Sequence, residues 1–203
     1  MRKILAATAL AVTGALLYLL LRRRPTRLTR WELYMRMIAT TLRHGREVAC
    51  VIYSDGRAEC HMLGPYGGCF RVDDNVVEIV HTHPLPRWTP SIDDIASTYN
   101  ISRALGREIP MKVLTYIPDE EKLIIYEVKI RPDALPEEIV ALLHELLPFE
   151  EMTVCIDPML ASELQHEAMR LFDKISITRT VLKVPRTLLE SLPDVEGNVI
   201  LSS

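Results

Sequence analysis

The sequence predicts a mixed α/β sandwich. Amphipathic helical patterns and β-prone runs follow one another in the order helix, strands, helix, strands, which is typical of that class. A length of 203 residues allows one well-buried core with an accessory piece, or two small domains. The sequence contains no internal repeat and no low-complexity tract. We therefore expect one α/β core with additions at its ends.

The first 21 residues predict a membrane anchor. Residues 4–21 carry no charge and are rich in alanine and leucine, and as a helix they would span roughly 27 Å of hydrocarbon. Two basic residues precede this run and five arginines follow it by position 30, so the remainder of the chain is expected to face the cytoplasm. A cleaved signal peptide fits less well, because the run ends in LLLRRRP without a small-residue cleavage site. We predict a single-pass anchor in the cell membrane over residues 1–24 and a basic linker over residues 25–30.

The charge balance argues against a nucleic-acid partner. Seven of the 24 lysine and arginine residues lie in the first 30 positions, which contain no acidic residue. The rest of the chain therefore has 17 basic and 27 acidic side chains, a net charge near −10. A body of this charge without a basic stripe is unsuited to bind a polyanion.

The four cysteines indicate neither a structural zinc site nor a disulfide framework. Cys50, Cys60, Cys69 and Cys155 form no CxxC pair, and a reducing cytosol is the simpler setting for them. We expect Cys50 to be an ordinary core residue. A pairing of Cys60 with Cys69 across a hairpin is the alternative that we considered.

The core is predicted to begin with a helix and a meander of strands. Apolar residues recur at helical spacing over residues 31–44. A β-prone run follows at 47–53, and an SDG turn allows residues 57–63 to return as its partner. After a glycine-rich loop, residues 69–72 are expected to form a short edge strand.

The second part of the core contains the strongest strand pattern. Residues 76–83 are rich in valine and isoleucine and are stopped by a proline. Three prolines within the seven residues 84–90 predict that residues 85–90 form a loop. A serine-initiated cap predicts a helix from 91 to about 105, and residues 111–117 and 122–130 form a hairpin pair around PDEE.

Residues 131–203 are expected to form an accessory α+β extension, which leaves the core at residues 31–130. The extension is predicted to contain helices at 136–147, 158–175 and 188–193 and strands at 152–156, 176–184 and 198–203.

Three side chains have the spacing of ligands for one divalent metal. His81 and His83 are two residues apart in a predicted strand, so both project from the same face. Asp94 would lie in the first turn of the following helix and reach back toward the strand end. Two imidazoles and one carboxylate leave a tetrahedral position open for water, which is the pattern of catalytic rather than structural zinc.

A metal-bound water also needs a general base, and Glu47 at the head of a buried strand is our candidate. Glu59 and Glu78 are alternatives, although the odd spacing of Glu78 from His81 would turn it to the other face. Ser91 is expected to donate a hydrogen bond to the oxyanion of a tetrahedral intermediate. The same serine is also a credible helix cap, and the two roles are compatible.

These positions resemble a known motif: Glu47, His81, Thr82, His83, Pro84, Pro90, Ser91 and Asp94. They are similar to the JAMM motif of the MPN+ (JAB) domain, a family of zinc peptidases that cut isopeptide bonds to ubiquitin and ubiquitin-like proteins. The resemblance covers residues 31–130. It implies one Zn²⁺ per chain held by His81, His83 and Asp94, water activated by Glu47, an oxyanion contact from Ser91, and a cytidine-deaminase-like α/β/α sandwich.

The function expected from this resemblance is hydrolysis of isopeptide or C-terminal peptide bonds of a ubiquitin-like protein by a metal-activated water. A catalytically silent MPN-like binding module in a membrane complex is the alternative from another class. Release of a small group from a sulfur-carrier protein would use the same activated water. The sequence leaves the particular substrate and the oligomeric state open, and it lacks the HExxH of the zincins.

Overall fold

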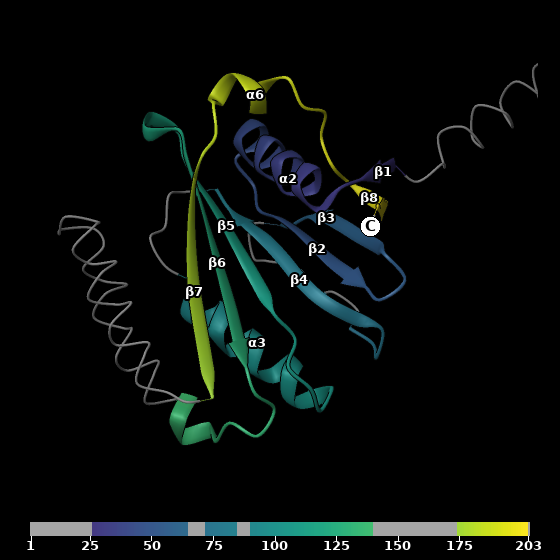
Figure 1. The fold of residues 1–203 in the computed structure, drawn as a ribbon, viewed down its shortest axis with the longest axis vertical. Helices are drawn as coiled ribbons and strands as arrows, with labels where there is room; N and C mark the ends of the chain where they lie inside the picture. The colour runs from purple at the N-terminus through teal and green to yellow at the C-terminus, as the bar shows by residue number, and fades with distance from the viewer. Residues whose placement is uncertain (1–25, 65–71, 85–89, 140–173, 203) are drawn as a thin grey trace, which may run out of the picture.

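The structure is a computed structural model that describes residues 26–64, 72–84, 90–139 and 174–202. In these residues eight strands form one mixed sheet in the order β1-β8-β3-β2-β4-β5-β6-β7 (Figure 1). The strands are β1 (Thr26–Leu28), β2 (Val48–Tyr53), β3 (Arg57–Met62), β4 (Val76–His83), β5 (Met111–Ile117), β6 (Lys122–Ile130), β7 (Ile175–Lys183) and β8 (Gly197–Leu201). The helices are α2 (Arg30–His44), α3 (Ile92–Ala104), the short α6 (Arg186–Glu190) and the 3-10 turn η1 (Pro118–Glu120). The predicted mixed α/β class is confirmed.

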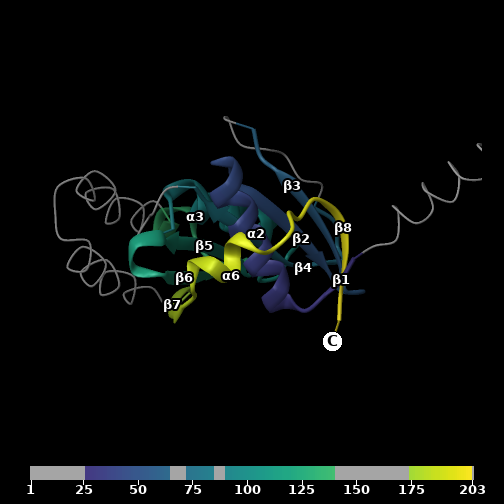
Figure 2. The same ribbon diagram turned by 90° about the horizontal axis from the view of Figure 1, so that it is seen from above.

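The two long helices cover opposite faces of the sheet (Figures 1 and 2). On one face Leu33 and Met37 of α2 belong to a buried cluster with Val80 of β4. On the other face Ile95 of α3 belongs to a separate buried cluster with Val113 of β5. The sheet is therefore the middle of three layers, and alternate residues of each central strand face different helices.

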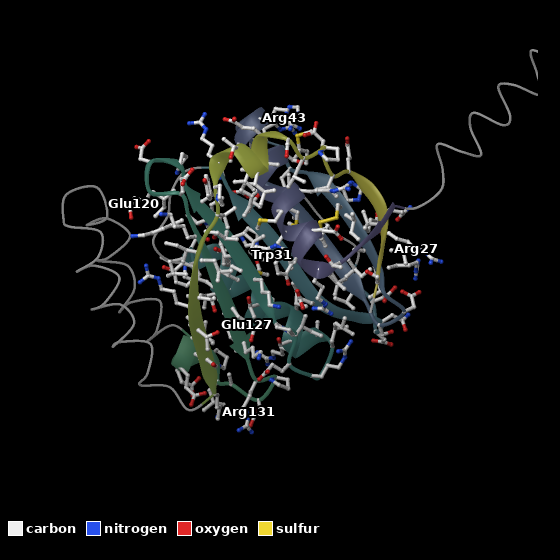
Figure 3. All side chains as sticks on the ribbon, turned by 45° about the horizontal axis from the view of Figure 1, so that its top comes forward. Arg27, Trp31, Arg43, Glu120, Glu127 and Arg131 are labelled. Atoms are coloured by element: carbon white, nitrogen blue, oxygen red, sulfur yellow. A yellow bond between two sulfur atoms is a disulfide. The ribbon has the colours of Figure 1, made fainter. Side chains whose placement is uncertain are left out.

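Helix α2 has strong signals at both of its ends. Thr29 accepts the backbone N–H of Glu32, and the Glu32 carboxylate accepts the backbone N–H of Thr29, which completes a capping box. Gly45 ends the helix with φ at 63°, a left-handed conformation that glycine adopts without strain. Trp31 in the first turn of α2 and Glu127 of β6 are both seen on the α2 side of the sheet in Figure 3.

The basic linker predicted at residues 25–30 is wrong for part of its length. Residues Thr26–Leu28 form β1, which pairs in parallel with β8, and α2 already begins at Arg30. Leu28 is buried, and its carbonyl accepts the backbone N–H of Ser202. Three residues are too few to show a periodic pattern, and their partner strand lies at the far end of the chain. The strand therefore has no local signal.

The C-terminal segment completes the sheet at two places. β7 pairs with β6 along its whole length, whereas β8 inserts between β1 and β3. The predicted strands at 176–184 and 198–203 are thus found as β7 and β8, within one residue at their starts. The helix and strand predictions between residues 140 and 173, and the edge strand predicted at 69–72 over most of its length, lie outside the described residues.

The predicted anchor also lies outside the residues that the structure describes. Within those residues no helix combines the length and the apolar character needed to cross a bilayer. The anchor over residues 1–24 therefore stays a prediction.

Two cysteines form a disulfide that the sequence analysis did not predict. Cys50 of β2 and Cys60 of β3 are direct register partners, with their Cα atoms 4.1 Å apart, and they are joined by a disulfide. Both are fully buried in the cluster beneath α2. Cys50 is a core residue as expected, but the expectation that it is an ordinary one is wrong because it forms a disulfide, and the alternative pairing of Cys60 with Cys69 is also wrong. Cys69 itself lies outside the described residues.

Candidate metal centre

The sheet brings the three predicted ligands together on the α3 face. Thr82 contacts α2 through its hydroxyl, so its neighbours His81 and His83 point to the other side of β4. Asp94 lies in the first turn of α3, directly above them. His81 Nε2 is 2.9 Å from Asp94 Oδ1, and His83 Nε2 is 3.4 Å from Asp94 Oδ2. The two histidine Nε2 atoms are 3.1 Å apart.

These distances fit ligands that share one metal ion. Zinc binds imidazole nitrogen and carboxylate oxygen at about 2.0–2.1 Å, so two ligand atoms of one tetrahedron lie about 3.3 Å apart. The three separations in the structure fall around this value, and all three residues are buried, at 8%, 8% and 7% exposure. His81, His83 and Asp94 thus form a buried group that is able to hold a metal ion.

The electrostatics of the group favour a cation. Burial by itself would lower the pKa of His81, but the charge and hydrogen bond of Asp94 outweigh it and raise that pKa. Burial would likewise raise the pKa of Asp94, yet the two histidines hold it well below its usual range. Asp94 is therefore a carboxylate at neutral pH, and its negative charge inside the fold needs a positive partner.

Local structure at the start of α3 fixes the position of Asp94. Ser91 is the N-cap of this helix: its backbone N–H donates to Asp94 Oδ2 at 2.6 Å, and its hydroxyl accepts the Asp94 N–H at 3.2 Å. This reciprocal pair is a capping box. Thr98, one turn later, donates to the backbone carbonyl of Asp94 at 2.6 Å. The predicted cap is confirmed, and it holds the carboxylate of Asp94 toward β4.

Glu47 lies on the same face as the ligands. The antiparallel pairing of β2 with β4 ends at Ala49 opposite His81, and strand alternation carried two residues further would turn the Glu47 side chain to the same side as Ala49. After burial and the charge and hydrogen bond of Asp94, the charge of Glu47 is a further cause that raises the pKa of His81. Glu47 is partly exposed, whereas β2 behind it is buried throughout.

The two alternative bases are elsewhere. Glu78 points to the α2 face, where its buried carboxylate accepts hydrogen bonds from Arg30 and from the Tyr34 hydroxyl and lies 3.4 Å from Lys112 Nζ. Glu59 is on β3, where one carboxylate oxygen lies 2.9 Å from His61 Nε2. Of these three carboxylates, Glu47 is the one whose charge acts on the pKa of His81.

Two buried polar atoms beside the site have no hydrogen-bond partner. They are Nδ1 of His83 and Oγ1 of Thr115. Thr115 on β5 is the register partner of His83, and since partners in a parallel pair face the same side, both side chains lie in the α3 layer. A ligating histidine usually donates its second ring N–H to an outer partner. We expect the Thr115 hydroxyl to take that role through a bridging water.

Two threonines near the centre, Thr41 and Thr115, and the partners of Thr82 were not predicted from the sequence. Thr82 and Thr41 form a hydroxyl pair behind β4, and Thr115 neighbours His83. The alternation of β4 would have placed Thr82 opposite the two ligands, but nothing in the sequence indicates what it contacts there.

Searches of protein-family models, of curated proteins and of solved structures found no match to this chain. The class of site is therefore defined by its own geometry: a buried group of two histidines and one aspartate that is able to hold a metal ion.

Proposed function

We propose that this chain is a zinc-dependent metallopeptidase of the JAMM type that hydrolyses isopeptide or C-terminal peptide bonds of ubiquitin-like proteins. The observation that carries the proposal is the convergence of His81, His83 and Asp94 within ligand distance, with Glu47 on the same face. We further propose that the three layers are those of the cytidine-deaminase-like sandwich and that residues 1–24 anchor the enzyme to a membrane, with the centre on the cytoplasmic side.

His81 Nε2, His83 Nε2 and one oxygen of Asp94 would hold the ion. When bound, zinc supplies Lewis acidity and lowers the pKa of a coordinated water toward neutrality. Three protein ligands leave a further coordination position open, as in catalytic rather than structural sites. Two histidines and a carboxylate also suit ferrous iron, so the metal has to be identified by analysis of the purified protein.

Glu47 is the residue that moves the proton. Its carboxylate takes the proton of the attacking water as the water oxygen bonds to the carbonyl carbon of the substrate. It then delivers that proton to the departing amine nitrogen as the carbon–nitrogen bond breaks. General acid–base catalysis of this kind contributes about 10²–10⁴ in rate.

Ser91 supports the developing oxyanion. Its hydroxyl oxygen already accepts the N–H of Asp94, so the hydroxyl proton is left for donation to the substrate oxygen. One such donor is worth about 3–4 kcal/mol in the barrier when it is aimed at the oxyanion.

The test is hydrolysis by purified full-length chain of ubiquitin-fold proteins carrying C-terminal or isopeptide-linked extensions. We expect Glu47→Gln to lose about 10²–10⁴ in kcat while still binding zinc in stoichiometric amount by elemental analysis. Glu59→Gln is the matched control, because Glu59 lies outside the centre on the neighbouring β3 strand, and it should retain activity.

Three results would count against the proposal. They are undiminished cleavage by Glu47→Gln, cleavage that survives removal of the metal by a chelator, and a purified chain that holds zinc but cleaves no member of the panel. The last result would favour the silent binding module.

A further inference from the structure

A pair of buried threonine hydroxyls lies behind the metal centre. Thr82 stands between the two histidine ligands on β4 but points to the opposite face, toward α2. There its hydroxyl is hydrogen-bonded to that of Thr41. Thr82 is 1% exposed and Thr41 is 4% exposed. Buried hydroxyls are kept where they satisfy a specific partner, because an unpaired one is costly.

The partner of this pair is the backbone next to Glu47. The N–H of Val48 donates to Thr82 Oγ1 at 2.9 Å, and Thr82 Oγ1 donates to the Val48 carbonyl at 3.3 Å. The pairing of β2 with β4 reaches only to Ala49 opposite His81. The Thr82 side chain therefore continues the connection between the two strands one residue beyond their paired region.

The donors and acceptors of this chain balance. A threonine hydroxyl has one proton and two acceptor lone pairs. Because the Thr82 hydroxyl donates its proton to the Val48 carbonyl, Thr41 is the donor between the two hydroxyls. Thr82 then accepts from both Thr41 and the Val48 N–H. Val48 is fully buried. A methyl group in place of the Thr82 hydroxyl would therefore leave the Val48 N–H without this partner.

We propose that Thr82, supported by Thr41, is the positioning residue for Glu47. The backbone around Glu47 is held from two sides. On the β3 side the Glu47 carbonyl accepts the N–H of Leu63 at 2.8 Å, and on the β4 side Thr82 holds the next peptide at Val48. Thr82 on β4 thus fixes the position of the Glu47 backbone relative to His81 and His83 on the same strand. The inference rests on the proposed function only where it treats Glu47 as the base.

The consequence for catalysis is geometric. A misplacement of about 1 Å between a reacting group and its target can lower a rate by about 10²-fold. Loss of the Thr82 hydroxyl should therefore reduce kcat more than KM, because the ligands and the substrate surface stay in place while the base moves.

The first experiment measures amide hydrogen exchange by NMR in the full-length, zinc-loaded chain. We expect Thr82→Val to increase exchange of the Val48 amide about tenfold, the value of one buried hydrogen bond. The Leu63 N–H donates to the Glu47 carbonyl. If the backbone at Glu47 moves, the Leu63 amide should therefore also exchange faster. Thr82→Ser should restore protection at both amides, and Thr41→Val should show a smaller change in the same direction.

Thr40→Val is the matched control. Thr40 is a fully buried threonine of α2, the helix that also carries Thr41. Its hydroxyl donates to the Arg36 carbonyl and accepts the Val195 N–H. Its loss removes buried hydrogen bonds of the same kind without touching β2 or β4. Exchange at Val48 and Leu63 should not change in this variant.

The second experiment separates kcat from KM with a substrate that the wild-type chain cleaves. Thr82→Val should lower kcat about 10- to 100-fold, with KM and zinc content unchanged, and Thr82→Ser should return most of it. Unchanged exchange at both amides in Thr82→Val would overturn the proposal. So would loss of zinc from that variant, since Thr82 would then act on the ligands. If the wild-type chain has no hydrolase activity, the proposed function fails, and the exchange data alone decide whether Thr82 fixes residue 47.

Discussion

Replacement of Asp94 by asparagine tests the metal centre most directly. Asparagine keeps the shape of the side chain and an oxygen that accepts the Ser91 N–H, so the helix cap survives. The substitution removes the anionic ligand. If the centre binds zinc as proposed, free zinc at about 1,000 times Kd should stabilise the native wild-type chain by roughly 4.1 kcal/mol. For a chain of this size each kcal/mol raises Tm by about 2–4 °C, so zinc should raise Tm by roughly 8–16 °C.

The same zinc concentration should raise the Tm of Asp94→Asn only slightly. If Kd weakens about a thousandfold, free zinc equals Kd and the stabilisation falls to about 0.4 kcal/mol, or roughly 1–2 °C in Tm. Only the zinc-dependent change in Tm is compared, because Asp94→Asn also removes the ion pair with His81 from the metal-free state.

The control for this comparison is Asp93→Asn, which removes the same charge from the same helical turn at an exposed position. It should keep the full zinc-dependent rise in Tm, measured by scanning calorimetry with and without chelator. A rise in Asp94→Asn equal to that of Asp93→Asn would refute the assignment of Asp94 as a ligand.

Two further predictions concern the surroundings of His83 and a surface ion pair. Thr115→Val should weaken zinc affinity about tenfold in competition with a chromogenic chelator, and Thr115→Ser should not, because the hydroxyl is the outer partner available to His83 Nδ1; equal affinities in the two variants would contradict this role. The hydrogen bond from His44 and the charge of Arg43 lower the pKa of Asp194, so this exposed group stabilises the fold above its ordinary pKa, and the stabilisation is lost as pH falls through the lower folded value. Asp194→Asn should therefore reduce the free energy of unfolding in urea by less than about 1 kcal/mol at pH 7, and this difference should shrink as pH falls through the lowered pKa of Asp194; a difference that does not shrink in acid would show that the ion pair is not its cause.

The candidate site could be predicted because its signals are local. His81 and His83 share a face through strand alternation, and Ser91 and Asp94 carry their own capping pattern. Glu47 could be proposed only from its context, because its distance from the histidines depends on how β2 pairs with β4. The hydroxyl of Thr82 shows the limit, since its partners Val48 and Thr41 come from two other elements.

The disulfide could have been found by counting outward from a turn. The SDG turn predicted the β2–β3 hairpin, and Cys50 and Cys60 are equally far from its centre, so they face each other in the pairing. Strand β1 had no comparable signal, because it consists of three residues whose partner β8 is formed at the other end of the chain. Contacts of that range depend on the assembled fold rather than on neighbouring sequence.

If residues 1–24 are the proposed anchor, the pairing of β1 with β8 would limit the distance between the sheet and the bilayer. Only residues 22–25 separate the predicted apolar span from Thr26, the first residue of β1, and four residues extend at most about 14 Å. Because β1 is paired within the sheet, only residues 22–25 would link the predicted apolar span to the sheet. If residues 1–24 are the proposed anchor, the candidate metal centre would therefore be held close to the membrane surface.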